Sequence, residues 1–315
     1  MKAVNLSCAG SNSNTGIQTC SWTPSNITGA ILLPAGKSYT TTDVSVLWTT
    51  LQADCANNTA SSRIYPIGAF KAIEDKSSDV QIESDGYGGK SFVRDGDYEW
   101  MFEYKNGFCF YQKLRTFHTK NSSFDVMFID EVNNVLWGTE NADGELAGFG
   151  LELLIVPNIK INTGSNATKY YISFGLSDPT ELNDSSYTVQ FPNNQKLVKL
   201  AGLLDTNITA GTTSSTGDGE VIVTATSSCG AVDLVELYPA DIVDTTIWNV
   251  WNRTLSQAVA VTGATIAGGV LTLETDIADH AAGNVLEIYL GDVTALTTAG
   301  IVGFASSNTV TSTVV

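Results

Sequence analysis

The residue types that carry most enzymatic and metal chemistry are few and scattered in this sequence. There are two histidines, His118 and His280. A zinc site would need closely spaced ligands, such as Cys-x-x-Cys or His-x-x-x-His, and neither spacing occurs. Asp279 precedes His280, but the Gly-x-Ser-x-Gly turn of a serine hydrolase is missing. We therefore predict no catalytic residues, no metal site and no cofactor, and we expect that the protein is not an enzyme.

The five cysteines leave two interpretations open. They are Cys8, Cys20, Cys55, Cys109 and Cys229. Cys8 and Cys20 are near enough in sequence to form a disulfide that would staple an N-terminal arm. The odd number and wide spacing instead favour unpaired thiols in a protein that is made in the cytoplasm. We favour the second interpretation.

A glycine-rich stretch over residues 84–97 resembles the end of a phosphate-binding P-loop. Gly89-Lys90-Ser91 has the right residue types, but Ser84 stands where the first glycine of that motif belongs. Asp95-Gly96 also breaks any helix that would begin after Ser91, so no helix N-terminus is present to bind a phosphate. We predict a long flexible loop here.

The acidic residues of this stretch raise the alternative of a calcium site. Asp85, Asp95 and Asp97 offer carboxylate oxygens, which calcium prefers. Their spacing is not that of an EF-hand loop, and Lys90 and Arg94 add positive charge. We therefore do not predict a metal ion here.

Aromatic residues provide a second candidate for binding chemistry. The six tryptophans are Trp22, Trp48, Trp100, Trp137, Trp248 and Trp251. A sugar-binding platform would need several of them on one surface. They are dispersed, and most lie within apolar patterns, so we predict that they pack in the core.

The overall composition excludes further classes of partner. The 315 residues include 33 acidic and 16 basic ones, which gives a formal net charge of −17. Nucleic-acid binding needs a basic surface, and anionic lipids repel an acidic one. The first eight residues lack the apolar stretch of a signal peptide, and other apolar runs are too short to span a bilayer. We expect no membrane partner and synthesis in the cytoplasm.

The elements that must position any site are mostly strands. Tyr98, Trp100, Phe102 and Tyr104 alternate with polar residues, which is typical of a half-buried strand. Helical spacing of apolar residues predicts helices over about 43–55, with an N-cap at Thr42-Asp43, and 107–119. Further strands are predicted over 31–34, 64–73, 79–83, 124–130, 136–139, 150–156 and 169–177. Residues 178–200 give no clear pattern.

Composition changes sharply at residues 209–219, which are almost all small and polar. We predict a linker there, and hence an N-terminal arm over 1–35, a first β domain over 36–212 and a second over 213–315. The last segment carries short apolar strands at the spacing of an immunoglobulin-like sandwich. It contains 11 acidic residues and one basic residue, Arg253.

Four segments of the central region occur in a characteristic order. They are Asp95-Gly96-Asp97-Tyr98-Glu99, Phe110-Tyr111-Gln112-Lys113-Leu114-Arg115, Phe124-Asp125-Val126-Met127-Phe128-Ile129-Asp130-Glu131 and Gly144-Glu145-Leu146-Ala147-Gly148-Phe149. This order of strand, amphipathic helix, strand with hairpin and returning strands resembles that of phage tail tube proteins, over about residues 80–177. Residues 221–315 resemble the immunoglobulin-like modules that decorate phage tails and capsids.

The resemblance implies a mainly β fold: a tail-tube-like sandwich or barrel with one or two packed helices, followed by an immunoglobulin-like sandwich. Tube subunits form stacked, usually hexameric rings in which sheets join edge to edge. DNA would pass an acidic lumen without specific binding. The implied location is the virion, after assembly in the host cytoplasm. The implied partners are identical copies and the terminator, tape measure and baseplate proteins of the tail.

In tube proteins, N-terminal arms and long loops reach the next ring, a role that the resemblance gives here to residues 1–35 and 84–97. The candidate inter-subunit residues are Trp22, Asp85, Tyr87, Lys90, Arg94 and Asp97. Two alternatives remain. A capsid decoration or head fibre protein belongs to the same class, whereas a surface adhesin or glycan-binding module belongs to another.

Overall fold

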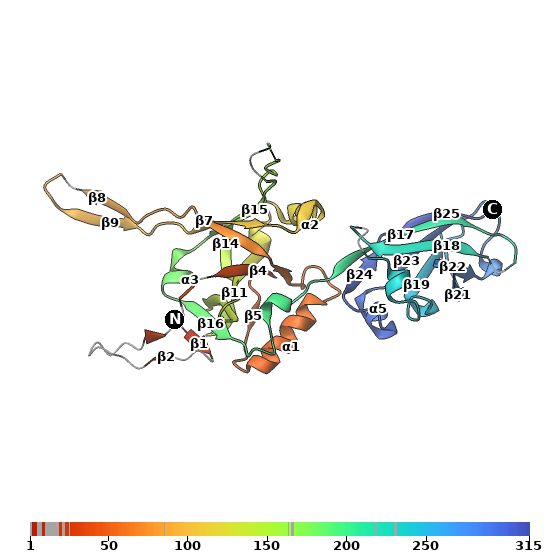
Figure 1. The fold of residues 1–315 in the computed structure, drawn as a ribbon, viewed down its shortest axis with the longest axis horizontal. Coiled ribbons are helices and arrows are strands. Elements are labelled where there is room, and N and C mark those ends of the chain that lie inside the picture. Colours follow the sequence, from red (N-terminus) through yellow and green to blue (C-terminus); the bar gives the residue numbers. More distant parts are fainter. Residues whose placement is uncertain are drawn as a thin grey trace. The chain divides into compact units, whose positions relative to one another are not determined.

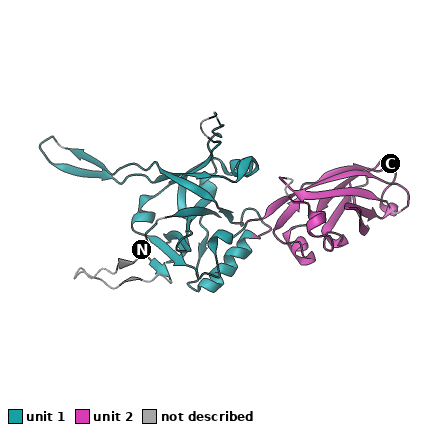
Figure 2. Ribbon diagram, viewed as in Figure 1, with its two compact units in different colours: residues 1–55, 59–201 teal, residues 56–58, 202–315 magenta. Residues whose placement is uncertain are grey.

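A computed structural model describes residues 2–4, 8–9, 19–20, 23–24, 26–84, 86–162, 164, 167–217, 219–229 and 232–315. The chain divides into two compact units (Figure 2). Unit 1 contains residues 1–55 and 59–201, and unit 2 contains residues 56–58 and 202–315. Both are built mainly of strands, as the sequence predicts. The division falls after residue 201, earlier in the chain than the expected boundary at 212/213.

Unit 1 is built around one large twisted sheet with a few short helices (Figure 1). The strand order along the sheet is β1-β16-β12-β11-β14-β15-β10-β7, and β4, β5, β6 and β13 branch from this path. The strands are β1 (Lys2–Val4), β2 (Cys8–Ala9), β3 (Thr19–Cys20), β4 (Ile27–Pro34), β5 (Ser38–Tyr39), β6 (Tyr65–Ile67), β7 (Phe70–Asp75), β8 (Gln81–Ser84), β9 (Lys90–Arg94), β10 (Glu99–Tyr104), β11 (Phe124–Asp130), β12 (Val135–Glu140), β13 (Leu146–Ala147), β14 (Phe149–Ile155), β15 (Tyr170–Leu176) and β16 (Ser186–Gln190). The helices are α1 (Val44–Cys55), α2 (Gly107–Leu114), α3 (Pro179–Asn183) and the 3-10 turns η1 (Arg115–Phe117), η2 (Asn121–Ser123) and η3 (Leu197–Lys199).

The core of unit 1 lies on both faces of this sheet. Alternate residues of a strand point to opposite faces, so a strand that is covered on both sides is apolar throughout. In β4, Leu32 joins an aromatic cluster that includes Phe102 and Phe128. The neighbouring Leu33 joins a second cluster, to which α1 contributes Leu47. This two-sided burial explains the uninterrupted apolar run in β4.

The first predicted helix is confirmed as α1. The Asp43 carboxylate accepts a hydrogen bond of 2.9 Å from the Ser45 backbone N–H, which satisfies one of the free donors of the first turn. Burial of Val44, Leu47 and Leu51 then holds the helix on the sheet. The second predicted helix is shorter than expected, because α2 ends at Leu114 and the chain continues as the 3-10 turn η1.

Unit 2 is a sandwich of two sheets. One has the order β21-β22-β18-β17-β24 and the other β20-β19-β23-β25. The strands are β17 (Leu204–Thr213), β18 (Val221–Ser227), β19 (Trp248–Asn252), β20 (Gln257–Val259), β21 (Val261–Ala267), β22 (Val270–Thr275), β23 (Val285–Leu290), β24 (Phe304–Ser307) and β25 (Val310–Thr313). The helices are α4 (Leu234–Leu237), α5 (Val293–Ala299) and the 3-10 turns η4 (Thr245–Ile247) and η5 (Ile277–Asp279). Residues from both sheets share one apolar core.

The structure corrects the expected linker at 209–219. Its first half belongs to β17, whose residues pair with β18 from Thr206 opposite Ser227 to Thr213 opposite Val221. Buried Ile208 anchors this strand in the core of unit 2. Threonine favours strands when a sheet is available to pair with, so this small, polar sequence is not a spacer.

Candidate functional site

The stretch expected to be a flexible loop, residues 84–97, is largely part of a two-stranded hairpin. β8 pairs only with β9 in the described residues, and Ile82 lies opposite Phe92. The hairpin continues the β7–β10 pair outward, away from the sheet of unit 1 (Figure 1). The expectation of a loop was wrong for β9. Its sequence is polar and flanked by glycines, and so it does not indicate that this segment pairs with β8.

The neck of this hairpin, where the chain passes from the β7–β10 pair into the β8–β9 pair, is closely packed. The Ser78 backbone N–H donates to the Asp97 carbonyl at 2.9 Å, and the Asp97 N–H donates back to the Ser78 hydroxyl at 2.8 Å. A Cβ atom at Gly96 would lie only 1.9 Å from the Ser78 carbonyl oxygen. Glycine is therefore required at position 96, where the segment that contains Gly96 passes close to the backbone of Ser78.

The hairpin carries apolar side chains that no other layer of the described part of unit 1 covers. Every residue of β8 and β9 is exposed, and the exposed fractions are 60% for Ile82, 63% for Phe92 and 52% for Val93. A two-stranded hairpin is at best marginally stable by itself in water. A partner that covers its apolar side chains removes them from water, which is energetically favourable. We call the side chains of Val80, Ile82, Tyr87, Phe92 and Val93 the hairpin surface.

The structure brings four of the six predicted contact residues together on this hairpin. Tyr87 lies in its turn and is 99% exposed, Lys90 begins β9, and Arg94 forms a 3.5 Å ion pair with Asp97 at the neck. This ion pair is solvated on both sides and contributes little to stability. Trp22 and Asp85 lie outside the described residues. Sequence reasoning missed Ile82, Phe92 and Val93, which the strand pairing would have revealed.

The edge of the main sheet next to this hairpin is open in the part of unit 1 that the structure describes. β7 is the last strand in the order, and its residues Lys71 to Asp75 are all exposed, with Ile73 at 51%. Unpaired backbone groups on an edge strand accept a further strand from another chain. Charged residues at Lys71, Glu74 and Asp75 limit indiscriminate pairing, so a matching partner strand is favoured over general aggregation.

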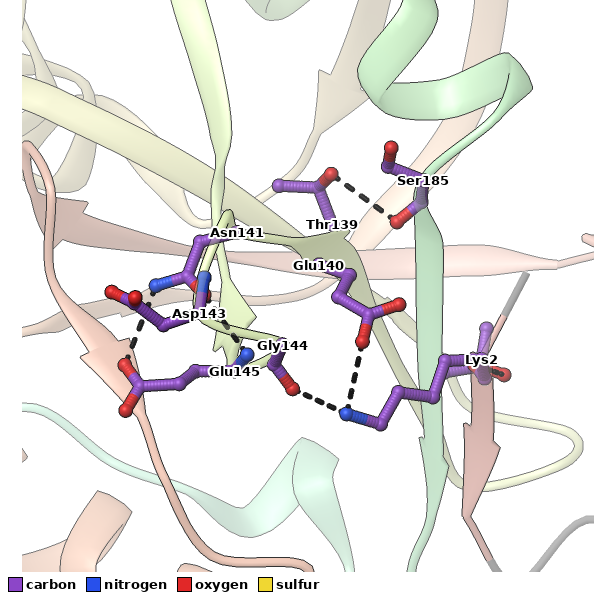
Figure 3. A network of polar contacts seen from close by, with 9 residues as sticks. Lys2, Thr139, Glu140, Asn141, Asp143, Gly144, Glu145 and Ser185 are labelled. Carbon is purple, nitrogen blue, oxygen red and sulfur yellow. Dashed lines mark hydrogen bonds and ion pairs between the residues drawn. The ribbon is translucent and has the colours of Figure 1, made fainter.

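The strand at the other end of the order is β1, which pairs in parallel with β16. Figure 3 shows the contacts that hold it. The Lys2 ammonium donates to the Glu140 carboxylate at 3.0 Å and to the Gly144 carbonyl. The ammonium also lies 4.7 Å from the centre of the Tyr187 ring, a contact that the figure does not draw. The hydrogen bond that the Lys2 ammonium donates to Glu140 raises the pKa of Lys2 above its ordinary value. The turn after Glu140 is fixed by the side-chain Oδ1 of Asn141, which accepts hydrogen bonds from the backbone N–H groups of Asp143 and Glu145.

Half-buried carboxylates are the feature of unit 1 closest to a catalytic pattern. Burial raises the pKa of both Asp125 and Glu181. Each carboxylate, however, accepts a hydrogen bond from a glycine backbone N–H, Asp125 from Gly36 at 2.7 Å and Glu181 from Gly150 at 2.8 Å. These bonds tie the turn at Gly36 and the helix α3 to the sheet, which is a structural role. Among the described residues, no group of three or more histidine, cysteine or acidic side chains has a geometry that could hold a metal ion.

The two histidines occupy different surroundings. The Nδ1 atom of His118 accepts a hydrogen bond of 3.1 Å from the Val156 backbone N–H, which is a structural role. His280 is buried in unit 2, and its Nε2 lies 2.9 Å from the Thr275 hydroxyl, which donates to the Gly219 carbonyl. Because that hydroxyl proton is already used, Nε2 must be the donor, and Nδ1 is left buried without a partner in the described structure.

We expect unit 2 to lose stability as the pH falls below about 6.5, the ordinary pKa of histidine. Burial lowers the pKa of His280, and the weaker effect of Asp279 and Asp276 opposes this. The unfolded chain therefore binds a proton before the folded one does, and the free energy of unfolding decreases as the pH falls through the folded pKa. Hydrogen exchange of unit 2 peptides between pH 7 and pH 5 would measure this. In the His280→Gln variant, the stability of unit 2 should no longer depend on pH in this range. If the variant shows the same change of stability with pH as the wild type, other groups cause the dependence.

No protein-family model matches the sequence, and a search of curated proteins finds no match. None of the helices in the described ranges is long and apolar enough to cross a membrane.

Proposed function

We propose that the protein is a structural subunit that assembles with copies of itself. The observation that carries this proposal is the hairpin surface, where apolar side chains on both strands of an isolated hairpin are more than half exposed. The open edge of β7, which leads into the same hairpin, supports it with unpaired backbone groups. Together they provide an apolar surface and a strand edge for a neighbouring copy.

Among self-assembling proteins, we propose the phage tail tube. The resemblance of residues 80–177 to tube subunits supports this choice, and the mainly β fold of unit 1 is compatible with it. Edge-to-edge joining of sheets around a ring would pair the β7 edge, and the hairpin would reach a copy in the next ring. The net charge of −17 is compatible with a lumen that does not retain DNA.

In this proposal the rings are hexameric and the protein belongs to the virion. Its other partners are the terminator, tape measure and baseplate proteins of the tail. A capsid decoration or head fibre protein is the second candidate, because unit 2 is a β-sandwich of the type found in such modules.

The oligomeric state of the full chain tests the proposal. Electron microscopy and multi-angle light scattering of the purified protein should show rings or tubes. Trimers or decorated shells would favour the decoration protein. A protein that stays monomeric at high concentration would overturn self-assembly altogether.

A further inference from the structure

The outer face of the four-stranded sheet of unit 2 carries two exposed aromatic rings. In β19 and β23, every second residue points into the core; these residues are Trp248, Val250, Asn252, Leu286, Ile288 and Leu290. Trp251 and Tyr289 belong to the outward set, and their exposed fractions are 39% and 37%. The expectation that the tryptophans pack in the core is therefore wrong for Trp251.

The strand register places these two rings on the same small area. Trp251 lies opposite Glu287, and Asn249 lies opposite Tyr289. Trp251 and Tyr289 are thus diagonal neighbours on one face, a position at which Cβ atoms are about 7 Å apart. Asn249 and Glu287 lie between them.

Both rings are set apart from the remaining aromatic residues of unit 2. Those residues, Trp248, Tyr238 and Phe304, are buried or packed against the core. In the described structure, the Trp251 indole N–H and the Tyr289 hydroxyl have no hydrogen-bond partner within the protein, and neither has the Asn249 amide. The face therefore offers flat apolar surface and unused hydrogen-bonding groups side by side.

Charge limits what such a face can bind. Residues 202–315 contain 12 acidic residues and one basic residue, Arg253. Arg253 lies 3.7 Å from Glu287, so the one cation is next to a carboxylate. An anionic polymer would be repelled by the rest of the unit. A neutral partner is compatible with this charge, and one with apolar faces and many hydroxyl groups would use both the rings and the unused hydrogen-bonding groups.

We propose that the outer face of β19 and β23 binds a neutral saccharide chain. The rings of Trp251 and Tyr289 stack on the C–H faces of two sugar rings, because aromatic side chains present a flat apolar surface with a polar group at the edge. The Asn249 amide and the Glu287 carboxylate bond to sugar hydroxyls and fix the orientation of the chain. This binding site is separate from the hairpin surface and does not depend on self-assembly.

Titration calorimetry of the full chain with neutral hexasaccharides of glucose, xylose, mannose and N-acetylglucosamine tests this. We expect binding of at least one of them, and a loss of affinity of about tenfold or more for Trp251→Ala, since each lost stacking contact of about 1.4 kcal/mol is one factor of ten. Tyr289→Ala should show a smaller loss. The control Ile222→Ala, which removes a side chain that is 55% exposed on the other sheet, should bind as the wild type does.

Three results would overturn the proposal. The first is no binding of any of these sugars by the wild type at millimolar concentration. The second is a Trp251→Ala variant that binds as tightly as the wild type. The third is a Trp251→Ala variant with a changed oligomeric state in sedimentation velocity, which would make the face a protein interface instead. Thermal unfolding of each variant checks that the fold is retained, as expected for exposed positions.

Discussion

Replacing Ile82 and Phe92 together by threonine is expected to abolish assembly of the full chain and leave its fold intact. The two side chains form a cross-strand pair on the hairpin surface, and each is at least 60% exposed. When a neighbouring copy covers these two side chains, each such contact contributes about 2–3 kcal/mol to the free energy of association. This corresponds to roughly a hundredfold in affinity. Threonine keeps the preference for strands, so the hairpin itself should persist. Light scattering and electron microscopy would measure the loss.

The control is a double variant that replaces two other exposed apolar side chains of unit 1 by threonine. Val46 lies on the exposed side of α1 and Val132 in the turn between β11 and β12, with exposed fractions of 50% and 69%. Their replacement by threonine should leave assembly unchanged. Assemblies of the Ile82→Thr/Phe92→Thr variant that match those of the wild type would show that the hairpin surface is not the contact.

Replacing Asn134 by alanine is expected to destabilise unit 1 by about 3–5 kcal/mol. The side chain is 4% exposed, and its Nδ2 lies 2.9–3.1 Å from the carbonyl oxygens of Phe191, Pro192 and Gln195, which share its two N–H donors. Its Oδ1 accepts from the Leu197 N–H at 3.0 Å. Alanine would leave the buried Phe191 carbonyl and the buried Leu197 N–H without these partners.

The backbone of Asn134 adds a second contribution. Its φ of 51° lies in the left-handed region, which asparagine tolerates better than alanine does. A thermal unfolding midpoint lower by about 10 °C would be the result of the combined loss. The Asn134→Gly variant keeps the backbone conformation without strain and separates the two contributions. Asn193→Ala, at an exposed position of the same segment, is the control. A midpoint within two or three degrees of the wild type, on the scale of about 2–4 °C per kcal/mol, would contradict the assigned role of Asn134.

Asn134 also explains why residues 191–200 have no readable pattern in the sequence. They contain a short 3-10 turn, η3, and are otherwise irregular. Their conformation is held by a side chain about 60 residues earlier in the chain. No local propensity within the segment encodes such a bond.

The sequence determined those elements whose signals are local. The helix α1 follows from an N-cap and apolar spacing, β10 from aromatic alternation, and the β11–β12 hairpin from a turn between two apolar runs. In each of these, the residues that decide the conformation lie within a few positions of one another. The mainly β class of both units follows from the same patterns.

Only the tertiary structure decided which strands have a partner and which face is covered. β17 is a strand because β18 is beside it, although its sequence has the composition of a linker. Trp248 and Trp251 are three positions apart in β19, so alternation places them on opposite faces. Which of them enters the core depends on where the second sheet lies, and the packing of two sheets is a property of residues far apart in the chain.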